Sequence, residues 1–252
     1  ECAVPFNMEA DSLNSAILGP DAVPGTPEFD LFVKEVRKEM TVKCGQKCTA
    51  VRRIFVPEGV MDAVQDALVG QLANTTIGDP QTDGVRMGAL VGKAQCQDVL
   101  DQVQHIEAEA ECVFGASKTA EVIGAELERG AFLPPMLMRH DRPHEARAVH
   151  DVEAFGPVST LMPYTDLEEA VSLAARGKGS LCCSITTFDR QAAATFVREA
   201  APMHGRILVL DRECAKESTG HGSPMPLLVH GGPGRAGGGE EMGGLRGIKH
   251  YM

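Results

Sequence analysis

The sequence predicts an α/β protein with a mostly parallel, twisted sheet that carries helices on both faces. Three observations support this prediction. Strand-like and helix-like segments alternate along nearly the whole chain, apolar residues recur at helical spacing in the longer segments, and several short runs are continuously apolar. The 252 residues suffice for one large α/β domain, and 43% apolar with 23% charged residues is typical of a globular chain.

The first half of the chain alternates between short apolar strand candidates and amphipathic helices. Proline marks two of the boundaries: Pro27 lies near the start of one helix, and Pro57 ends one strand. The expected strands and extended segments are 15–19, 50–57, 110–115 and 130–140, and the expected helices are 27–43, 58–75 and 93–109.

The second half continues the pattern until about residue 218. Residues 180–189 are continuously apolar and β-branched, as in a strand buried on both faces. We expect Thr165 to cap a helix over 165–177 and Gly177 to end it. Strands over 155–164 and 205–211 and a helix over 190–200 complete the pattern. Residues 218–252 are Gly-rich and are expected to form an ordered loop and a C-terminal helix, without the spacing of a phosphate-binding loop.

Charge and cysteine usage exclude several classes of protein. A net charge of −11 argues against non-specific nucleic-acid binding, because there is no basic excess to displace counterions. No apolar run approaches the roughly 18 residues that a membrane helix needs, and the N-terminus lacks the pattern of a secretory signal. The eight cysteines follow neither a disulfide-scaffold nor a zinc-ligand spacing. We therefore expect a cytoplasmic protein with free thiols and no metal.

Two thiols stand out, because Cys44 and Cys48 lie where a helical pattern gives way to a strand. Such a junction holds a side chain rigidly within reach of solvent, and its backbone N–H groups can stabilise an oxyanion. Cys48 is therefore a candidate nucleophile, with a metal ligand, a disulfide partner and a small buried residue as the alternatives. If the helix continues, Cys44 shares its face and is expected to be a packing residue. Cys182 and Cys183 lie in a buried-strand pattern and are expected to be inert.

Five stretches resemble, in order, the aldehyde dehydrogenase superfamily. G-Q-K-C-T-A (45–50) resembles its nucleophile motif, and F-N-M-E-A-D-S-L-N (6–14) stands in the place of its general-base segment. The other three are 77–91, V-E-A-F-G-P-V (152–158) and the Gly-rich 230–251. The general-base segment and the Gly-rich stretch look most like the aldehyde dehydrogenase parts of the phenylacetate ring-opening bifunctional proteins and of the related 3,4-dehydroadipyl-CoA semialdehyde dehydrogenases.

The resemblance implies roles for four residues. Cys48 would attack an aldehyde to give a thiohemiacetal, which becomes a thioester when hydride leaves to a nicotinamide. Glu9 would be the general base, Glu153 would hold the nicotinamide ribose, and Phe155 would pack near the nicotinamide. The resemblance also implies a CoA-thioester semialdehyde as substrate, NADP or NAD as acceptor, and a homo-oligomer.

The position of Glu9 adds an expectation about domains. In the family the cofactor-binding domain lies mostly before the general-base segment, and here Glu9 is only nine residues from the start of the sequence. We expect 1–252 to be the catalytic domain, with the cofactor domain absent, weak NADP binding and little or no turnover. We also expect the Cys48 loop at the carboxyl ends of the strands, where open α/β sheets place ligands.

Three other interpretations stay open. A CoA-acylating dehydrogenase has less need of a water-activating carboxylate, so Glu9 argues against it. A non-catalytic scaffold predicts a deeply buried, unreactive Cys48. A thiol hydrolase predicts a histidine within hydrogen-bond distance of Cys48 and activity without nicotinamide. The neighbouring Lys47, Arg52 and Arg53 either attract an anionic CoA chain or form a solvated rim.

Overall fold

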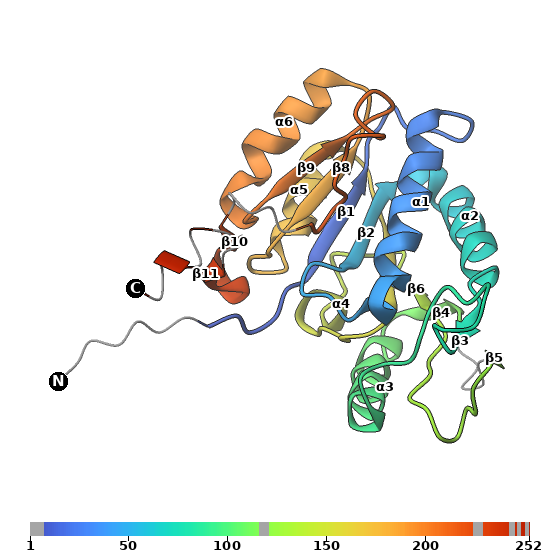
Figure 1. Cartoon of the computed structure of the whole chain (residues 1–252). Helices are drawn as coiled ribbons and strands as arrows, with labels where there is room; N and C mark the ends of the chain where they lie inside the picture. The colour runs from blue at the N-terminus through green and yellow to red at the C-terminus, as the bar shows by residue number, and fades with distance from the viewer. Residues whose placement is uncertain (1–7, 116–120, 224–228, 242–244, 246–247, 250–251) are drawn as a thin grey trace.

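A seven-stranded sheet forms the centre of the molecule (Figure 1). The computed structural model describes residues 8–115, 121–223, 229–241, 245, 248–249 and 252. The strand order is β4-β6-β7-β2-β1-β8-β9. The β4–β6 pair is antiparallel and every other neighbouring pair is parallel, so the predicted, mostly parallel sheet is confirmed. The strands are β1 (Asn14–Leu18), β2 (Val51–Pro57), β4 (Glu111–Phe114), β6 (Met136–Arg139), β7 (Val158–Tyr164), β8 (Cys183–Thr186) and β9 (Ile207–Leu210).

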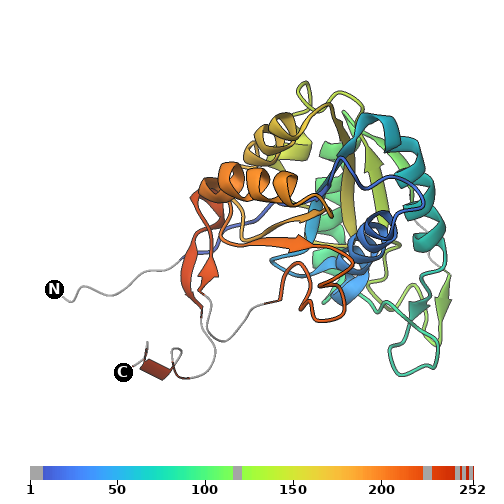
Figure 2. The ribbon, with the colours of Figure 1, turned by 90° about the horizontal axis from the view of Figure 1, so that it is seen from above.

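Helices cover both faces of the sheet, as predicted, and successive residues of β2 show how the two faces are separated. Ile54 belongs to the buried cluster that contains Phe32 of α1 and Leu68 of α2, whereas Phe55 belongs to the cluster that contains Val99 of α3 and Phe196 of α6. This alternation is the period of two expected of a strand that is buried on both sides. Figures 1 and 2 show α1 and α2 on one side of the sheet and α5 and α6 on the other. The helices are α1 (Pro27–Thr41), α2 (Met61–Ala73), α3 (Lys93–Glu107), α4 (Ala148–Asp151), α5 (Leu167–Ala175) and α6 (Arg190–Ala200).

Helix α1 ends earlier than predicted, and this separates the two thiols. Thr26 caps its start by accepting from Phe29 N at 3.3 Å. After Thr41 the chain passes into a 3₁₀ turn, η1 (Val42–Gly45), in which Lys43 and Cys44 both have φ of 54°. The left-handed residues break the helical repeat, so the prediction that Cys44 and Cys48 share a helix face is wrong. Cys44 is 1% exposed, which confirms it as a packing residue.

The start of α5 also differs from the prediction. Asp166, not Thr165, is the N-cap, because its side chain accepts from Glu169 N at 2.8 Å. The hydroxyl of Thr165 instead donates to Glu169 Oε2 at 2.6 Å. A carboxylate is as good an N-cap as a hydroxyl, so Asp166, which follows Thr165, can serve as the N-cap.

The Gly-rich region folds back onto the beginning of the described chain. Strand β10 (His230–Gly231) pairs with β11 (Gly238–Glu241) across a short turn, η4 (Gly234–Ala236), and Gly238 N donates to Met8 O at 2.7 Å. Figure 2 shows this hairpin beside the N-terminal segment. The predicted ordered loop is confirmed where the structure describes it, whereas the expected C-terminal helix lies largely outside the described residues. The remaining short elements are η2 (Glu58–Val60), β3 (Ile77–Gly78), β5 (Val122–Ile123) and η3 (Ala201–Met203).

The Cys48 loop lies at the amino ends of the strands, so the prediction that it lies at their carboxyl ends is wrong. Cys48 precedes β2, Glu9 precedes β1 and Glu153 precedes β7, and these three strands are parallel neighbours. In a parallel sheet each connection from a helix to the next strand returns to the amino edge. Each motif comes before its strand in the sequence, and this order places it at the amino edge of the sheet. The rule that ligands bind at the carboxyl ends of the strands in open α/β sheets does not hold for this loop.

Candidate active site

Cys48 is an exposed thiol on a firmly held backbone. It lies between η1 and β2, and its carbonyl oxygen accepts from Asn14 Nδ2 at 2.9 Å. The same amide nitrogen donates to Ala50 O at 2.9 Å, and Asn14 Oδ1 accepts from Cys182 N at 3.1 Å. Asn14 is fully buried at the first residue of β1. Sequence reasoning missed this residue, although a polar residue at the start of an apolar strand was a signal for it.

The other described thiols lie in different surroundings. Burial raises the pKa of both Cys44 and Cys183 to about 12, and it raises the pKa of Cys182 as well. Thiols of this kind stay protonated and react slowly. This confirms Cys182 and Cys183 as buried core residues, and Cys44 and Cys48 are not joined in a disulfide.

Gly45 brings the Cys48 loop into direct contact with the E-A-F-G-P loop. Its φ is +66°, and a Cβ atom built on it would lie 2.1 Å from the carbonyl oxygen of Gly156. No side chain fits in that space without moving the backbone of the facing loop. The glycine of the G-Q-K-C motif is therefore the contact point between two parts of the site that are more than a hundred residues apart in sequence.

Arg52 ties the same two loops together. Its side chain is 4% exposed and donates to Glu153 Oε1 at 3.2 Å, Gly156 O at 2.6 Å and Gly45 O at 2.9 Å. Its guanidinium also lies 5.3 Å from the ring centroid of Phe155, a cation–π arrangement. Arg52 is thus an internal clamp, and the prediction of a solvated or CoA-attracting residue is wrong.

The other two basic residues near Cys48, Arg53 and Lys47, also bind groups within the protein. Arg53 is fully buried and donates to carbonyl oxygens of Leu13 and Ala174, both at 2.8 Å. Burial lowers the pKa of Arg53 to about 9. Lys47 lies 2.7 Å from the buried carboxylate of Glu39 on α1. None of the three forms a solvated rim, because buried acceptors at this edge of the sheet need their hydrogen bonds.

Glu153 links the E-A-F-G-P loop to the segment that carries Glu9. Its carboxylate, 8% exposed, accepts from Ser12 N at 3.0 Å and from Arg52. Burial raises the pKa of Glu153, while the charge of Arg52 and these hydrogen bonds lower it, and the net shift is upward. The two protein donors use about half of the roughly four acceptor positions of a carboxylate, so the group retains capacity for donors from a ligand.

The Gly-rich loop supports the Glu9 segment. Gly238 has φ of +76°, and a Cβ atom on it would lie 2.8 Å from Glu9 Oε1 and 2.9 Å from Glu9 Cγ. Arg235 of the same loop forms a two-pronged ion pair with Asp11, two residues after Glu9. In the described residues this loop therefore positions the general-base candidate, and the glycine is needed because the carboxylate occupies the space of a side chain.

His230 is the residue that sequence reasoning did not single out. It lies on β10 with an imidazole that is 6% exposed, and its Nε2 is 3.3 Å from Cys48 Sγ and 3.7 Å from Glu9 Oε1. Its Nδ1 lies 3.5 Å from Arg206 Nη2. No local pattern pointed to it, because 182 residues separate it from Cys48. Glu9 and Cys48 thus come from the first fifth of the chain, and His230 comes from its last tenth.

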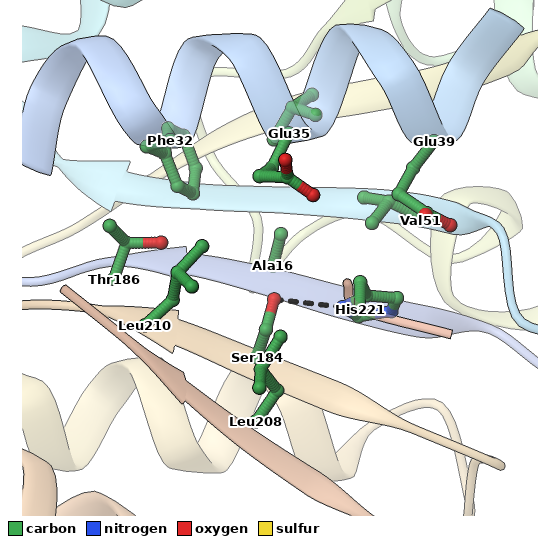
Figure 3. Close-up of a pocket in the computed structure, with 11 residues that line it drawn as sticks. Ala16, Phe32, Glu35, Glu39, Val51, Ser184, Thr186, Leu208, Leu210 and His221 are labelled. Carbon is green, nitrogen blue, oxygen red and sulfur yellow. Dashed lines mark hydrogen bonds between the residues drawn. The ribbon is translucent and has the colours of Figure 1, made fainter. Parts of the chain in front are cut away.

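A separate cavity of about 10 Å³ lies between α1 and the sheet (Figure 3). Its lining includes Glu39, Ser184 and His221, and His221 Nδ1 lies 2.8 Å from the Ser184 hydroxyl. Burial lowers the pKa of His221 to about 3. Room for about one water molecule makes this a packing void rather than a substrate pocket. Among the residues that the structure describes, no group is arranged to hold a metal ion and no helix is long and apolar enough to cross a membrane.

A parallel α/β domain in which an exposed thiol and a glutamate carboxylate both lie against one histidine, with the motifs in this order, indicates a thiol-dependent dehydrogenase domain. The chain belongs to the aldehyde dehydrogenase family, whose model matches residues 4–252. It is 49% identical over 231 residues to the 3,4-dehydroadipyl-CoA semialdehyde dehydrogenase of Aromatoleum evansii, a match that covers 92% of this chain and 45% of that protein. It is 52% identical over 166 residues to Protein MaoC of Klebsiella aerogenes, covering 66% of this chain and 48% of that protein.

Solved structures show the same fold. The betaine aldehyde dehydrogenase of Staphylococcus aureus, crystallised with NAD+, superposes with a TM-score of 0.81 at 21% identity, covering 99% of this chain and 45% of that chain. HpcC from Thermus thermophilus superposes with a TM-score of 0.77 at 21% identity, over 97% and 44%. The chain therefore spans about half the length of the relatives it matches, and the predicted family and fold class are confirmed.

Proposed function

We propose that the chain supplies the thiol half of the active site of a homo-oligomeric dehydrogenase that oxidises a CoA-thioester semialdehyde to the acid. NADP, or NAD, is the acceptor, and the pathway is the aerobic degradation of phenylacetate or benzoate. The observation that carries the proposal is the exposed Cys48 thiol, whose backbone is held by Asn14 and whose sulfur lies against the same His230 nitrogen as the Glu9 carboxylate. The 49% identity to a CoA-semialdehyde dehydrogenase supports the substrate class.

The residues of this chain account for the steps at sulfur. Glu9 takes the thiol proton, and the Cys48 thiolate attacks the aldehyde carbon, so that an S–C bond forms and the carbonyl oxygen gains the electron pair. A bound nicotinamide supplies the hydride acceptor, and Glu153 and Phe155 are the residues of this chain that would hold it. Glu9 then passes its proton to solvent and, as a carboxylate again, removes a proton from the water that attacks the thioester carbon; the C–S bond breaks with its electron pair on Cys48 sulfur, and the acid leaves.

The first experiment is alkylation of the native chain with limiting iodoacetamide across pH, with each cysteine followed by mass spectrometry. Cys48 is expected to react at least tenfold faster than the buried thiols, because only a thiolate reacts and burial disfavours it. Glu9→Gln is expected to change the pH profile of Cys48, whereas Glu58→Gln, an exposed substitution beyond the opposite end of β2, is expected to leave it unchanged. A Cys48 that reacts no faster than the other thiols and ignores Glu9 would overturn the proposal.

The substrate class has its own test, which needs no nicotinamide. An aldehyde that adds to Cys48 as a thiohemiacetal protects the sulfur from iodoacetamide. A CoA-linked semialdehyde is expected to protect at a concentration at least tenfold lower than the same semialdehyde without CoA, because the CoA part adds binding contacts. Equal protection by both compounds would remove CoA from the proposal and leave the thiol chemistry in place.

A thiol hydrolase is the second candidate, because His230 meets its geometric condition at 3.3 Å from Cys48 Sγ. In such enzymes a side-chain acceptor orients the histidine so that the nitrogen facing sulfur can take the proton. Here Arg206, which only donates, lies beside the other nitrogen instead. The hydrolase would be favoured if the chain released CoA from an acyl-CoA without nicotinamide and if the Cys48→Ala variant did not. The exposed Cys48 does not meet the condition of a scaffold, and Glu9 argues against a CoA-acylating enzyme.

A further inference from the structure

We propose that His230 is a further catalytic residue of this site, which stabilises the Cys48 thiolate by donating a hydrogen bond from Nε2, and that Arg206 positions it for that role. The inference rests on the proposed function, because it takes Cys48 as the nucleophile. It assigns a task to a histidine that neither the G-Q-K-C motif nor the general-base segment contains.

The first argument is the position of Nε2. This atom lies 3.3 Å from Cys48 Sγ and 3.7 Å from Glu9 Oε1, while the imidazole is 6% exposed. Both neighbours are acceptors when ionised, and an N–H is what each of them requires. A donated hydrogen bond stabilises a charged acceptor more than a neutral acceptor, and water competes less for it where the site is partly buried.

The second argument is the proton on the ring. Arg206 Nη2 lies 3.5 Å from Nδ1, and a guanidinium has donors only. Nδ1 must therefore present its lone pair to Arg206, which places the single proton of the neutral imidazole on Nε2. Arg206 is itself fixed, because it donates to Ser223 O at 2.5 Å and to Gly222 O at 3.5 Å. Gly222 O also accepts from the hydroxyl of Thr49, the residue after Cys48.

The third argument concerns charge. A second proton on His230 would place an imidazolium beside the guanidinium of Arg206, and like charges at that distance repel. Among the residues that the structure describes, the charged groups facing the ring include Glu9 from the N-terminal segment, Arg206 before β9 and the ionised Cys48, while Lys47 is held by Glu39. The proton of Cys48 therefore goes to Glu9: the S–H bond breaks, an O–H bond forms on the carboxylate, and the thiolate remains facing Nε2–H.

The experiment compares His230→Gln with His230→Ala in the alkylation assay on this chain, with the exposed His105→Gln as the matched control. His230→Ala is expected to slow Cys48 alkylation at neutral pH by about tenfold to a hundredfold, the usual worth of a hydrogen bond to a charged group. His230→Gln is expected to stay within about threefold of the unsubstituted chain, because an amide N–H still donates. His105→Gln is expected to change nothing.

Arg206→Met tests the positioning role through the pH profile. Without the guanidinium, Nδ1 is free to take a proton, so the Cys48 profile is expected to gain a step in the ordinary titration range of histidine. The step should disappear when Arg206→Met is combined with His230→Gln. An unchanged profile in Arg206→Met would overturn the role of Arg206.

Each remaining outcome separates this inference from the proposed function. If His230→Gln is as slow as His230→Ala, the histidine accepts the proton, and the donor role is overturned. If neither variant changes a Cys48 that is fast in the unsubstituted chain, only the inference fails. If Cys48 is not selectively reactive in the unsubstituted chain, both proposals fail. Should His230→Ala not fold by circular dichroism, His230→Gln and Arg206→Met still decide the question.

Discussion

At the scale of single residues, the site is organised by buried polar groups whose hydrogen bonds run between loops. Asn14 and Arg52 are both buried, and each holds the backbone around Cys48. Such groups are costly to disturb, because a buried partner left unpaired loses about 1–3 kcal/mol and more when it is charged. Substituting them tests how far the reactivity of Cys48 depends on the way its backbone is held.

Arg52→Met is expected to lower the free energy of unfolding by about 3–5 kcal/mol at neutral pH, because it leaves the buried carboxylate of Glu153 without its cation. The folded-state pKa of Glu153 already lies above its ordinary value, and losing Arg52 raises it further. A raised carboxyl pKa means that stability is present at low pH and falls as pH rises. The deficit of Arg52→Met should therefore be smaller at pH 4 than at pH 8 in urea titrations.

The matched control for this prediction is Arg198→Met, which removes an arginine that is 71% exposed on α6. It should change the free energy of unfolding by no more than about 0.5 kcal/mol. The double variant Arg52→Met with Glu153→Gln should recover part of the loss at pH 8. A loss that does not depend on pH would contradict the role given to the ion pair.

Asn14→Asp is expected to destabilise the fold by about 2–4 kcal/mol and to reduce the selectivity of alkylation for Cys48. The substitution keeps the shape of the side chain but turns the hydrogen bonds that Nδ2 donates to the carbonyl oxygens of Ser12, Cys48 and Ala50 into contacts between oxygens. Asn74→Asp removes a similar bond, to Gly70 O, at an exposed position and should cost about 1 kcal/mol or less. Equal effects of the two changes on Cys48 would show that the Asn14 bonds do not hold the nucleophile.

At the scale of elements, the hairpin of β10 and β11 closes the site by packing on the segment before β1. Gly238 leaves the space that the Glu9 carboxylate occupies, and the same hairpin presents His230 to Cys48. Gly238 is thus required by the close approach of the backbone to the Glu9 side chain.

Gly238→Ala is expected to displace Glu9 and so to alter the Glu9-dependent part of the Cys48 alkylation profile. Gly84→Ala is the matched control, because Gly84 has a similar φ of +87° but no atom within 4 Å of its Cβ position. Both changes should cost about 1–2 kcal/mol of stability through backbone strain, and only Gly238→Ala should change the reactivity of Cys48. An identical alkylation profile in both variants would remove the proposed contact from the mechanism.

At the scale of the whole molecule, three buried histidines set the response to acid. Burial lowers the pKa of His150 and His221 to about 3 and that of His204 to about 4. In the unfolded chain a histidine side chain has its ordinary pKa of about 6.5. Below pH 6.5 the unfolded state therefore binds more protons than the folded state does, so the free energy of unfolding falls as pH falls towards 4.

Each of these histidines is expected to contribute about 1 kcal/mol of lost stability between pH 6 and pH 5. His204→Asn keeps a hydrogen-bonding partner for the Ser180 hydroxyl but removes the titrating ring. Urea titrations of this variant should show a pH dependence that is weaker by that amount, whereas His105→Asn on the exposed face of α3 should not change it. A variant with the same slope as the unsubstituted chain would contradict the assignment of His204.

Much of the fold was readable locally. The apolar period placed β1, β2, α3 and α6 within one or two residues, because short buried strands and amphipathic helices carry their pattern in adjacent residues. The end of α1 was also placed within two residues, but the pattern did not show the left-handed turn at Lys43 and Cys44, which leads into the close approach of Gly45 to Gly156. The Cys48 loop was predicted at the wrong edge of the sheet, although the sequence already shows that each motif precedes its strand and so lies at the amino edge.

The sequence by itself determined the family, the alternation of strands and helices, and the candidate residues Cys48, Glu9, Glu153 and Phe155, because motifs and periodicity are local properties of a chain. Only the tertiary structure decided that Arg52 faces inward, that Asn14 holds the Cys48 backbone and that His230 reaches the sulfur. These contacts join residues that lie far apart in sequence, and their positions follow from the packing of parallel strands at one edge of a sheet. The spacing of residues along the chain does not predict contacts of this kind.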